Sequence, residues 1–276
     1  YDGDVKKVKG ADAKTFEAIE GYALGRDKNA VYDKGKMIKG LDPVTFEDLN
    51  GNFYKDKNGV YYEGMLMKGI DSKSFEPFVN YTHVKDKNGI YSFYQKENEV
   101  VVEKVEISPE IDLKTLQPIE NYSEYSKDKN NVYFINYKES EQKISDIDVE
   151  NAEDAGNDNY NIDIEIKKLE SADSGSFKID SIYGKDKNNL YFLNKKITGV
   201  NPKTFKVVGS NKLIIKDDKG VYYLGREEVK KIQNADLNTF EEVSKEYYRD
   251  KNNVYYYDNY DGDVKKVKGA DAKTFE

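Results

Sequence analysis

Hydrophobic positions along this chain recur in short bursts, and each burst follows a polar turn. Seven times an aliphatic residue and a tyrosine stand side by side, as at Val60 and Tyr61, one residue after the string Asp-Lys-Asn or a close variant. Asp and Asn bond their own backbone in tight turns, and Gly or Asn tolerates the left-handed conformation that a hairpin needs. β-Branched and aromatic residues favour strands. The pattern therefore predicts a turn that leads into a short strand.

The seven strings divide the chain into repeats, most of them about 30 residues long. Their aspartates are predicted to be structural turn residues, and they are Asp27, Asp56, Asp86, Asp128, Asp186, Asp218 and Asp250. Calcium ligands are the alternative for these aspartates. The lysine between Asp and Asn repels a cation, and the turn itself explains both flanking residues, so the turn is the favoured interpretation.

A second motif, Asp-x-x-Thr-Phe, lies between consecutive strings. Asp or Asn suits the cap of a helical turn, and Pro43 and Pro202 fall at its first position. We expect a single helical or 3₁₀ turn that places a phenylalanine in the core. The phenylalanines are Phe16, Phe46, Phe75, Phe205 and Phe240.

Each repeat is predicted to hold three short strands joined as antiparallel hairpins. In the strand after the turn, the aliphatic residue and the tyrosine are adjacent, so they point to opposite faces. Both recur in all seven copies, which indicates that the strand is covered on both faces, as in stacked sheets. The predicted fold is all-β: seven three-stranded antiparallel units of about 30 residues. Because seven units suit a seven-bladed ring, a propeller-like ring is favoured over an open β-solenoid or superhelix.

A longer repetition encloses the short one. Residues 1–17 recur without change as residues 260–276, a displacement of 259 residues. The hypothesis that follows is that residues 1–259 form one module of seven β repeats, with an acidic loop insertion at about 138–165. Residues 260–276 would then begin the next identical module of an array, and the sequence would continue after Glu276 with the residues that follow Glu17.

Composition narrows the classes of function. The chain has 24 tyrosines, 12 phenylalanines and no tryptophan, and tyrosine suits thin cores that lie close to solvent. The formal net charge of −8 argues against nucleic acid as a partner. Cysteine is absent, which excludes thiol chemistry and cysteine-based zinc sites. No apolar run approaches the roughly 20 residues that span a bilayer, so no membrane insertion is expected in this segment.

The string Asp-Lys-Asn-x-Val-Tyr-Tyr resembles the DKNYY repeat family of bacterial proteins. The resemblance covers all seven repeats. Departures are Asp33 and Ser92 at the second aromatic position, Gly220 in place of the asparagine, and Leu116 in place of the core phenylalanine. The resemblance implies bacterial tandem repeats of unassigned activity, with no catalytic residue to carry over.

The acidic insertion is the best candidate for a specific contact, because long loops on a rigid scaffold often carry function. We predict a partner-binding loop there, and a solvated loop is the alternative. Its acidic residues include Asp146, Asp148, Glu150, Asp154 and Asp158. The single histidine, His83, is interpreted as a surface or strand residue.

Catalysis is not predicted. A glycosidase needs one cleft with perturbed carboxylates, whereas repetition makes the acids of this chain interchangeable. We expect no catalytic residue, metal or cofactor. Repeated tyrosines could stack on sugars, but the first tyrosine is interpreted as structural and the second aromatic position varies too much for a repeated site.

These observations predict a non-catalytic bacterial repeat protein, extracellular or at the cell surface, that serves as a filament or display scaffold with an adhesive use. Its expected partners are other copies or modules of itself, with a host or cell-surface protein or glycan as a further class. The alternative is a propeller-type module that binds glycan or protein.

Overall fold

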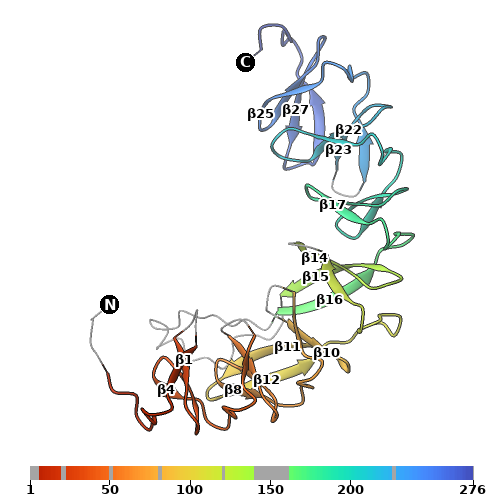
Figure 1. Cartoon of the computed structure of the whole chain (residues 1–276). Helices are drawn as coiled ribbons and strands as arrows, with labels where there is room; N and C mark the ends of the chain where they lie inside the picture. Colours follow the sequence, from red (N-terminus) through yellow and green to blue (C-terminus); the bar gives the residue numbers. More distant parts are fainter. Residues whose placement is uncertain are drawn as a thin grey trace. The chain divides into compact units, whose positions relative to one another are not determined.

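The computed structural model describes residues 6–19, 23–49, 52–79, 83–119, 122–139, 162–225 and 228–275 (Figure 1). These ranges contain 28 short strands and no helix. None of the described residues therefore belongs to a helix that could cross a membrane. The chain divides into two compact parts. The first comprises residues 1–114 and 136–165, and the second comprises residues 115–135 and 166–276.

The first three repeats form two sheets. The first sheet consists of β1 (Glu17–Ile19), β2 (Leu24–Arg26), β3 (Val31–Asp33) and β4 (Lys36–Met37). The second and third repeats share one eight-stranded sheet. Its strands are β5 (Glu47–Asp48), β6 (Phe53–Lys55), β7 (Val60–Tyr62), β8 (Met65–Met67), β9 (Glu76–Phe78), β10 (His83–Asp86), β11 (Gly89–Lys96) and β12 (Glu99–Lys104).

The remaining repeats form four separate sheets of four strands. The fourth repeat has β13 (Gln117–Ile119), β14 (Tyr122–Lys127), β15 (Val132–Glu139) and β16 (Ile162–Lys168). The fifth has β17 (Lys178–Asp180), β18 (Tyr183–Lys185), β19 (Leu190–Phe192) and β20 (Lys195–Ile197). The sixth has β21 (Lys206–Val208), β22 (Ile214–Lys216), β23 (Val221–Leu224) and β24 (Val229–Lys231). The seventh has β25 (Glu241–Ser244), β26 (Tyr247–Arg249), β27 (Val254–Asp258) and β28 (Asp263–Lys266).

Every repeat therefore has four strands, and the prediction of three was wrong. The strand that the sequence pattern missed is the first of each unit, such as β17, which follows directly after the phenylalanine of the Asp-x-x-Thr-Phe motif. It lies at the sheet edge and is largely accessible to solvent, so it carries no alternation of hydrophobic and polar residues. Apart from β15 and β16, consecutive strands within a unit pair antiparallel, as β17 to β20 do.

Tight hairpins join the third and fourth strands of the first two repeats. Lys34 and Gly35 have φ values of 48° and 78°, and Glu63 and Gly64 have values of 46° and 81°. Positive φ at both central residues is typical of the type I′ turn, whose twist matches that of the flanking strands. In the fourth repeat the same connection runs through residues 140–161, which lie outside the described residues.

The second and third repeats are joined edge to edge. β8 pairs in parallel with β12 through Met67 and Val100, which makes one curled sheet of the two units. Three rings pack together across this sheet: Tyr62 and Phe93 are 4.8 Å apart, and Phe53 lies 5.1 and 5.6 Å from them.

The middle of each sheet is buried on both faces, as predicted. The aliphatic residues after the Asp-Lys-Asn turns are at most 1% exposed, and the adjacent tyrosines at most 9%. The predicted ring, however, is not found, since the described sheets form no propeller. Stacking between consecutive sheets is enough to cover both faces of an inner sheet, so the burial that suggested a ring does not require closure.

Candidate functional site

The aspartate that opens an Asp-Lys-Asn turn is buried, and in most repeats it holds two separate turns together. In the fifth repeat, Oδ1 of Asp186 accepts hydrogen bonds from the backbone N–H groups of Asn188 and Asn189, both at 2.7 Å. Its Oδ2 accepts from the backbone N–H of Asp173 at 2.9 Å, and Asp173 opens the preceding Asp-x-x-Thr-Phe motif. Asp27, Asp56, Asp86 and Asp250 make the same three bonds. We term this residue the anchor aspartate.

The anchor of the sixth repeat is Asp217, one residue before the Asp218 that the sequence predicted. Asp217 is 4% exposed and accepts from the N–H groups of Asn201, Lys219 and Gly220. Both aspartates fit the string: counted from Asp218, Gly220 replaces the usual asparagine, whereas counted from Asp217, Asp218 replaces the lysine and Lys219 replaces the asparagine. The hydrogen bonds therefore shift the predicted register by one. The fourth anchor, Asp128, caps its own turn at Asn130 and Asn131.

A second set of contacts ties the same two motifs together at the surface. Lys187 forms an ion pair with Asp173 at 2.6 Å. Ser176, at the threonine position of the motif, accepts from the Lys187 N–H and donates to Asp173 Oδ1. Equivalent lysine–aspartate pairs recur in other repeats, among them Lys28–Asp12, Lys57–Asp42, Lys87–Asp71 and Lys251–Asp236. We term these contacts, together with the anchor aspartate, the interlock.

The interlock explains both repeated strings. The Asp-x-x-Thr-Phe segment forms a single turn, as predicted, in which the Ser176 N–H bonds to the Asp173 carbonyl at 3.2 Å. No described turn of this kind extends into a helix. Asp and Lys of one string and Asp and Thr or Ser of the other contribute their side chains to this contact, and sequence reasoning found the turns but not the contact between them.

Hydrogen bonds lower the pKa of several interlock carboxylates. Donation from the Asp12 backbone N–H holds the pKa of Asp27 at about 2, against an ordinary 3.8. The ammonium of Lys187, with Ser176, holds the pKa of Asp173 at about 2. Asp42, Asp71 and Asp236 have pKa values of about 2 for the same reason, since each accepts from a lysine of its own interlock.

In the sixth repeat, a hydrogen bond between a neutral amide and a carboxylate replaces the lysine–aspartate ion pair. Asn201 stands at the aspartate position, and Asp218 stands at the lysine position. The Asn201 amide donates to Asp218 Oδ1 at 2.9 Å, and the Thr204 hydroxyl donates to the same oxygen. Both residues of the pair differ from those of the other repeats, and the carboxylate now belongs to the Asp-Lys-Asn string instead of the Asp-x-x-Thr-Phe motif.

Within the second part, consecutive sheets stack through two different faces. One face carries the aliphatic residues, such as Leu190 and Ile197 of the β17–β20 sheet. The next sheet presents its tyrosine face, and Phe205, Ile215 and Tyr222 pack there in one cluster with those aliphatic residues. We term these the aliphatic face and the tyrosine face. The same pairing recurs between the fourth and fifth repeats and between the sixth and seventh.

The motif phenylalanine of the fifth repeat lies in the junction between two sheets. The Phe177 ring is 5.6 Å from Tyr125 of the preceding sheet and 5.8 Å from Tyr191 of its own sheet. The two copies of the 17-residue segment each make one of these contacts. Phe275 lies 5.4 Å from Tyr247 of the preceding sheet, and Phe16 lies 5.8 Å from Tyr32 of the following sheet.

The first tyrosine after each turn is a core residue, in agreement with its structural interpretation. The Tyr133 hydroxyl donates to Asp128 at 2.7 Å, and Tyr255 donates to Asp250 at 2.8 Å. Burial raises the pKa of Tyr191 to about 12. These rings offer no open face on which a sugar could stack.

The predicted partner-binding residues Asp146, Asp148, Glu150, Asp154 and Asp158 lie outside the described residues, so this site stays a prediction. In the ranges that the structure describes, no group of three or more acidic or histidine side chains is placed to hold a metal ion. His83 is a strand residue of β10, as one alternative held, but it is fully buried, and the surface alternative was wrong.

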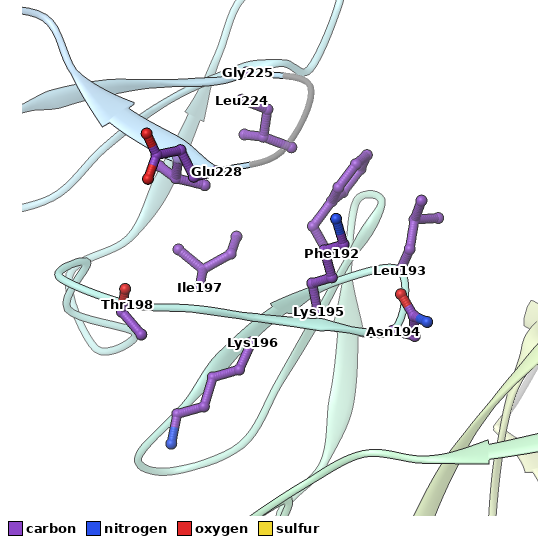
Figure 2. Close-up of a pocket in the computed structure, with 11 residues that line it drawn as sticks. Phe192, Leu193, Asn194, Lys195, Lys196, Ile197, Thr198, Leu224, Gly225 and Glu228 are labelled. Atoms are coloured by element: carbon purple, nitrogen blue, oxygen red, sulfur yellow. The ribbon is translucent and has the colours of Figure 1, made fainter.

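A pocket that sequence analysis did not predict lies between the fifth and sixth repeats. Its volume is about 230 Å³. Figure 2 shows two hairpins around it, with Phe192 and Ile197 on one side and Leu224 and Glu228 on the other. The lining also includes the polar residues Asn194, Lys195, Lys196 and Thr198. The sequence signal was present in two substitutions, Phe192 and Leu224, at positions where the next junction has tyrosines.

This fold and its interlock define a class of protein, an all-β tandem-repeat protein built from stacked four-stranded units. The chain belongs to the DKNYY family, whose profile matches residues 42–95 and 93–259. The first repeat lies largely before the matched region, although its anchor Asp27 has the same hydrogen bonds as those within it. Comparisons with curated proteins and with solved structures gave no match.

Proposed function

We propose that this chain is a non-catalytic scaffold of a bacterial cell surface, built from 259-residue modules that continue head to tail into a filament or display stalk. The supporting observation concerns Phe16 and Phe275, the equivalent residues of the two 17-residue copies. Phe16 contacts the sheet that follows it and Phe275 contacts the sheet that precedes it, whereas the internal residue Phe177 makes both contacts.

The segment 263–275 also completes the sheet before it. β28 pairs with β27, the Val267 N–H bonds to the Val254 carbonyl at 2.9 Å, and the Arg249 guanidinium donates to the Phe275 carbonyl. The segment 6–16 supplies the turn that the Asp27 anchor holds. If one segment made the contacts of both copies, it would pack against a sheet on each side, as Phe177 and its motif do inside the chain.

The chemistry of the junction favours the addition of further modules in a line. An aliphatic face meets a tyrosine face, so the interface is heterologous, and heterologous interfaces that do not close a ring generate open arrays. Other modules of the same protein are therefore the proposed partners. Adhesion is the proposed use of such an array, since a stalk carries binding surfaces away from the cell.

The test is a chain of two consecutive modules, with the single chain and a two-module Phe275→Ala variant as controls. Amide exchange in residues 17–37 of the second module should be slower than in the single chain, because a new junction covers that sheet. The variant should lose part of that protection. Equal exchange in all three proteins would refute the array.

Localisation needs a separate measurement on the native organism. Antibodies against the purified chain should label intact cells or shed filaments. Labelling only after lysis would contradict a surface role and leave the stacking chemistry intact.

A further inference from the structure

The junction between the fifth and sixth repeats lacks two phenol groups that the next junction has. Strand register aligns Phe192 with Tyr223, because each lies opposite the first residue of the preceding strand, Tyr183 or Ile214. It also aligns Leu224 with Tyr257, because their partners are Val229 and Val264.

The two tyrosines of the later junction make defined polar contacts. The Tyr223 hydroxyl donates to Asp263 Oδ1 at 2.6 Å, and the Tyr257 hydroxyl donates to the Leu224 carbonyl at 3.1 Å. Tyr257 is 4% exposed, so its ring fills this space.

The junction between the fifth and sixth repeats has an acidic residue at the position of Asp263, but it lacks the two tyrosine hydroxyl donors. Glu228 precedes Val229 as Asp263 precedes Val264, so an acidic residue stands at the equivalent strand position; its carboxylate is 72% exposed and lies 3.8 Å from Lys230 Nζ. Phe192 has no hydroxyl, and the Leu224 side chain is shorter than a tyrosine ring. The pocket of about 230 Å³ lies at this place (Figure 2).

We propose that this pocket binds one pyranose ring of a glycan. A sugar ring has an apolar C–H surface for Phe192, Ile197 and Leu224, and hydroxyl donors for the Glu228 carboxylate. Its further hydroxyls meet the side chains of Asn194, Lys195 and Thr198 at the rim.

A mixture of apolar walls and several polar groups is typical of sites that orient a small polar ligand. A phenol has one hydroxyl and leaves most of these rim groups without a ligand partner. The volume is below the roughly 300–1,000 Å³ of pockets for drug-sized ligands, so one ring is the unit bound. The site goes beyond the scaffold role and does not require it, since a single chain is sufficient for binding.

The experiment uses the full 276-residue chain and a panel of methyl pyranosides, which includes neutral hexoses and N-acetylhexosamines. Binding is detected by saturation-transfer NMR and titrated by calorimetry, with p-cresol as a phenol probe. At least one pyranoside should bind. Leu224→Tyr should weaken that binding more than tenfold because it restores the ring that fills the next junction.

Two further variants keep the test sharp. Glu228→Gln, at a side chain 72% exposed, should weaken binding severalfold without unfolding the chain. Val44→Tyr adds the same ring at a position that is 82% exposed and is not part of the pocket lining, and it should change nothing. The proposal fails if no pyranoside binds, if binding survives both Leu224→Tyr and Glu228→Gln, or if p-cresol alone binds. The last result would assign the pocket to an aromatic side chain of a protein partner.

Discussion

The ring of Phe275 lies 5.4 Å from the ring of Tyr247, in the position that the internal phenylalanines take against the preceding sheet. Phe205 and Tyr183 are 5.0 Å apart, and Phe177 and Tyr125 are 5.6 Å apart. The start of the second 17-residue copy is therefore packed as the start of a new repeat. Each sheet thus depends on the motif that follows it as well as on its own strands.

Removal of a junction phenylalanine should destabilise the sheets on both sides. Phe177→Ala should cost about 3–5 kcal/mol, because the ring is 5% exposed and its deletion leaves a cavity. Phe16→Ala is the matched control, since Phe16 is 39% exposed and contacts only its following sheet, so its cost should be clearly smaller. Urea unfolding measures both. Equal costs would contradict the bridging role of Phe177.

The anchor aspartate should matter far more than the lysine beside it. Asp186→Ala removes three hydrogen bonds that part-buried backbone N–H groups donate to one carboxylate, and a hydrogen bond to a charged group contributes about 1.5–3 kcal/mol. Lys187→Ala removes an ion pair at a side chain 60% exposed and should cost less than about 1 kcal/mol. A comparison of urea midpoints tests the difference, and similar losses would mean that the surface pair carries the interlock.

Sequence reasoning recovered the turns, the seven repeats and the two buried faces, because each rests on local chemistry or on period-2 alternation. It missed the first strand of every unit, since residues such as Lys178–Asp180 have no alternation to reveal them. It placed the sixth anchor at Asp218 because two adjacent aspartates fit the string equally well. The interlock and the pocket could not be predicted, because both depend on contacts between different strands or repeats.

The reversed pair of the sixth repeat should be energetically coupled. Asn201→Asp alone places a second carboxylate beside Asp218, and Asp218→Lys alone leaves an asparagine beside a lysine. The double variant restores the lysine–aspartate pair of the other repeats and should recover most of the stability lost in Asn201→Asp. A double-mutant cycle should give a coupling of about 0.5–1 kcal/mol, and this coupling should fall with added salt. Additive effects would show that the two residues are independent.

The stability effects of substitutions at Phe177 and at Gly184, the residue beneath its ring, should also be coupled. A Cβ at Gly184 would stand 2.4 Å from the Phe177 Cζ, so Gly184→Ser should destabilise the fifth repeat by about 1–3 kcal/mol. The fourth repeat has Leu116 and Ser126 at the two equivalent positions, both buried. Phe177→Leu should therefore rescue Gly184→Ser in part. No rescue in urea unfolding would mean that the fourth repeat accommodates its serine by a different backbone position.

Acid should unfold this protein over a defined range of pH. Asp27, Asp42, Asp71, Asp173 and Asp236 have folded-state pKa values of about 2, below the ordinary 3.8. A depressed carboxyl pKa contributes stability that is fully present above the unfolded value and lost as the pH falls through the folded value. The contribution of these carboxylates to the free energy of unfolding should therefore change little above pH 4 and fall steeply between about pH 4 and pH 2.

One substitution assigns this acid sensitivity to the interlock. Asp173→Asn removes one titrating carboxylate, so the variant should be less stable than the parent chain at pH 7. The difference between the two proteins should shrink as the pH falls from 4 to 2, because protonation removes the same interaction from the parent. Urea unfolding at a series of pH values, followed by circular dichroism, measures the difference directly. A difference that stays constant down to pH 2 would show that Asp173 is not an ionised partner of Lys187.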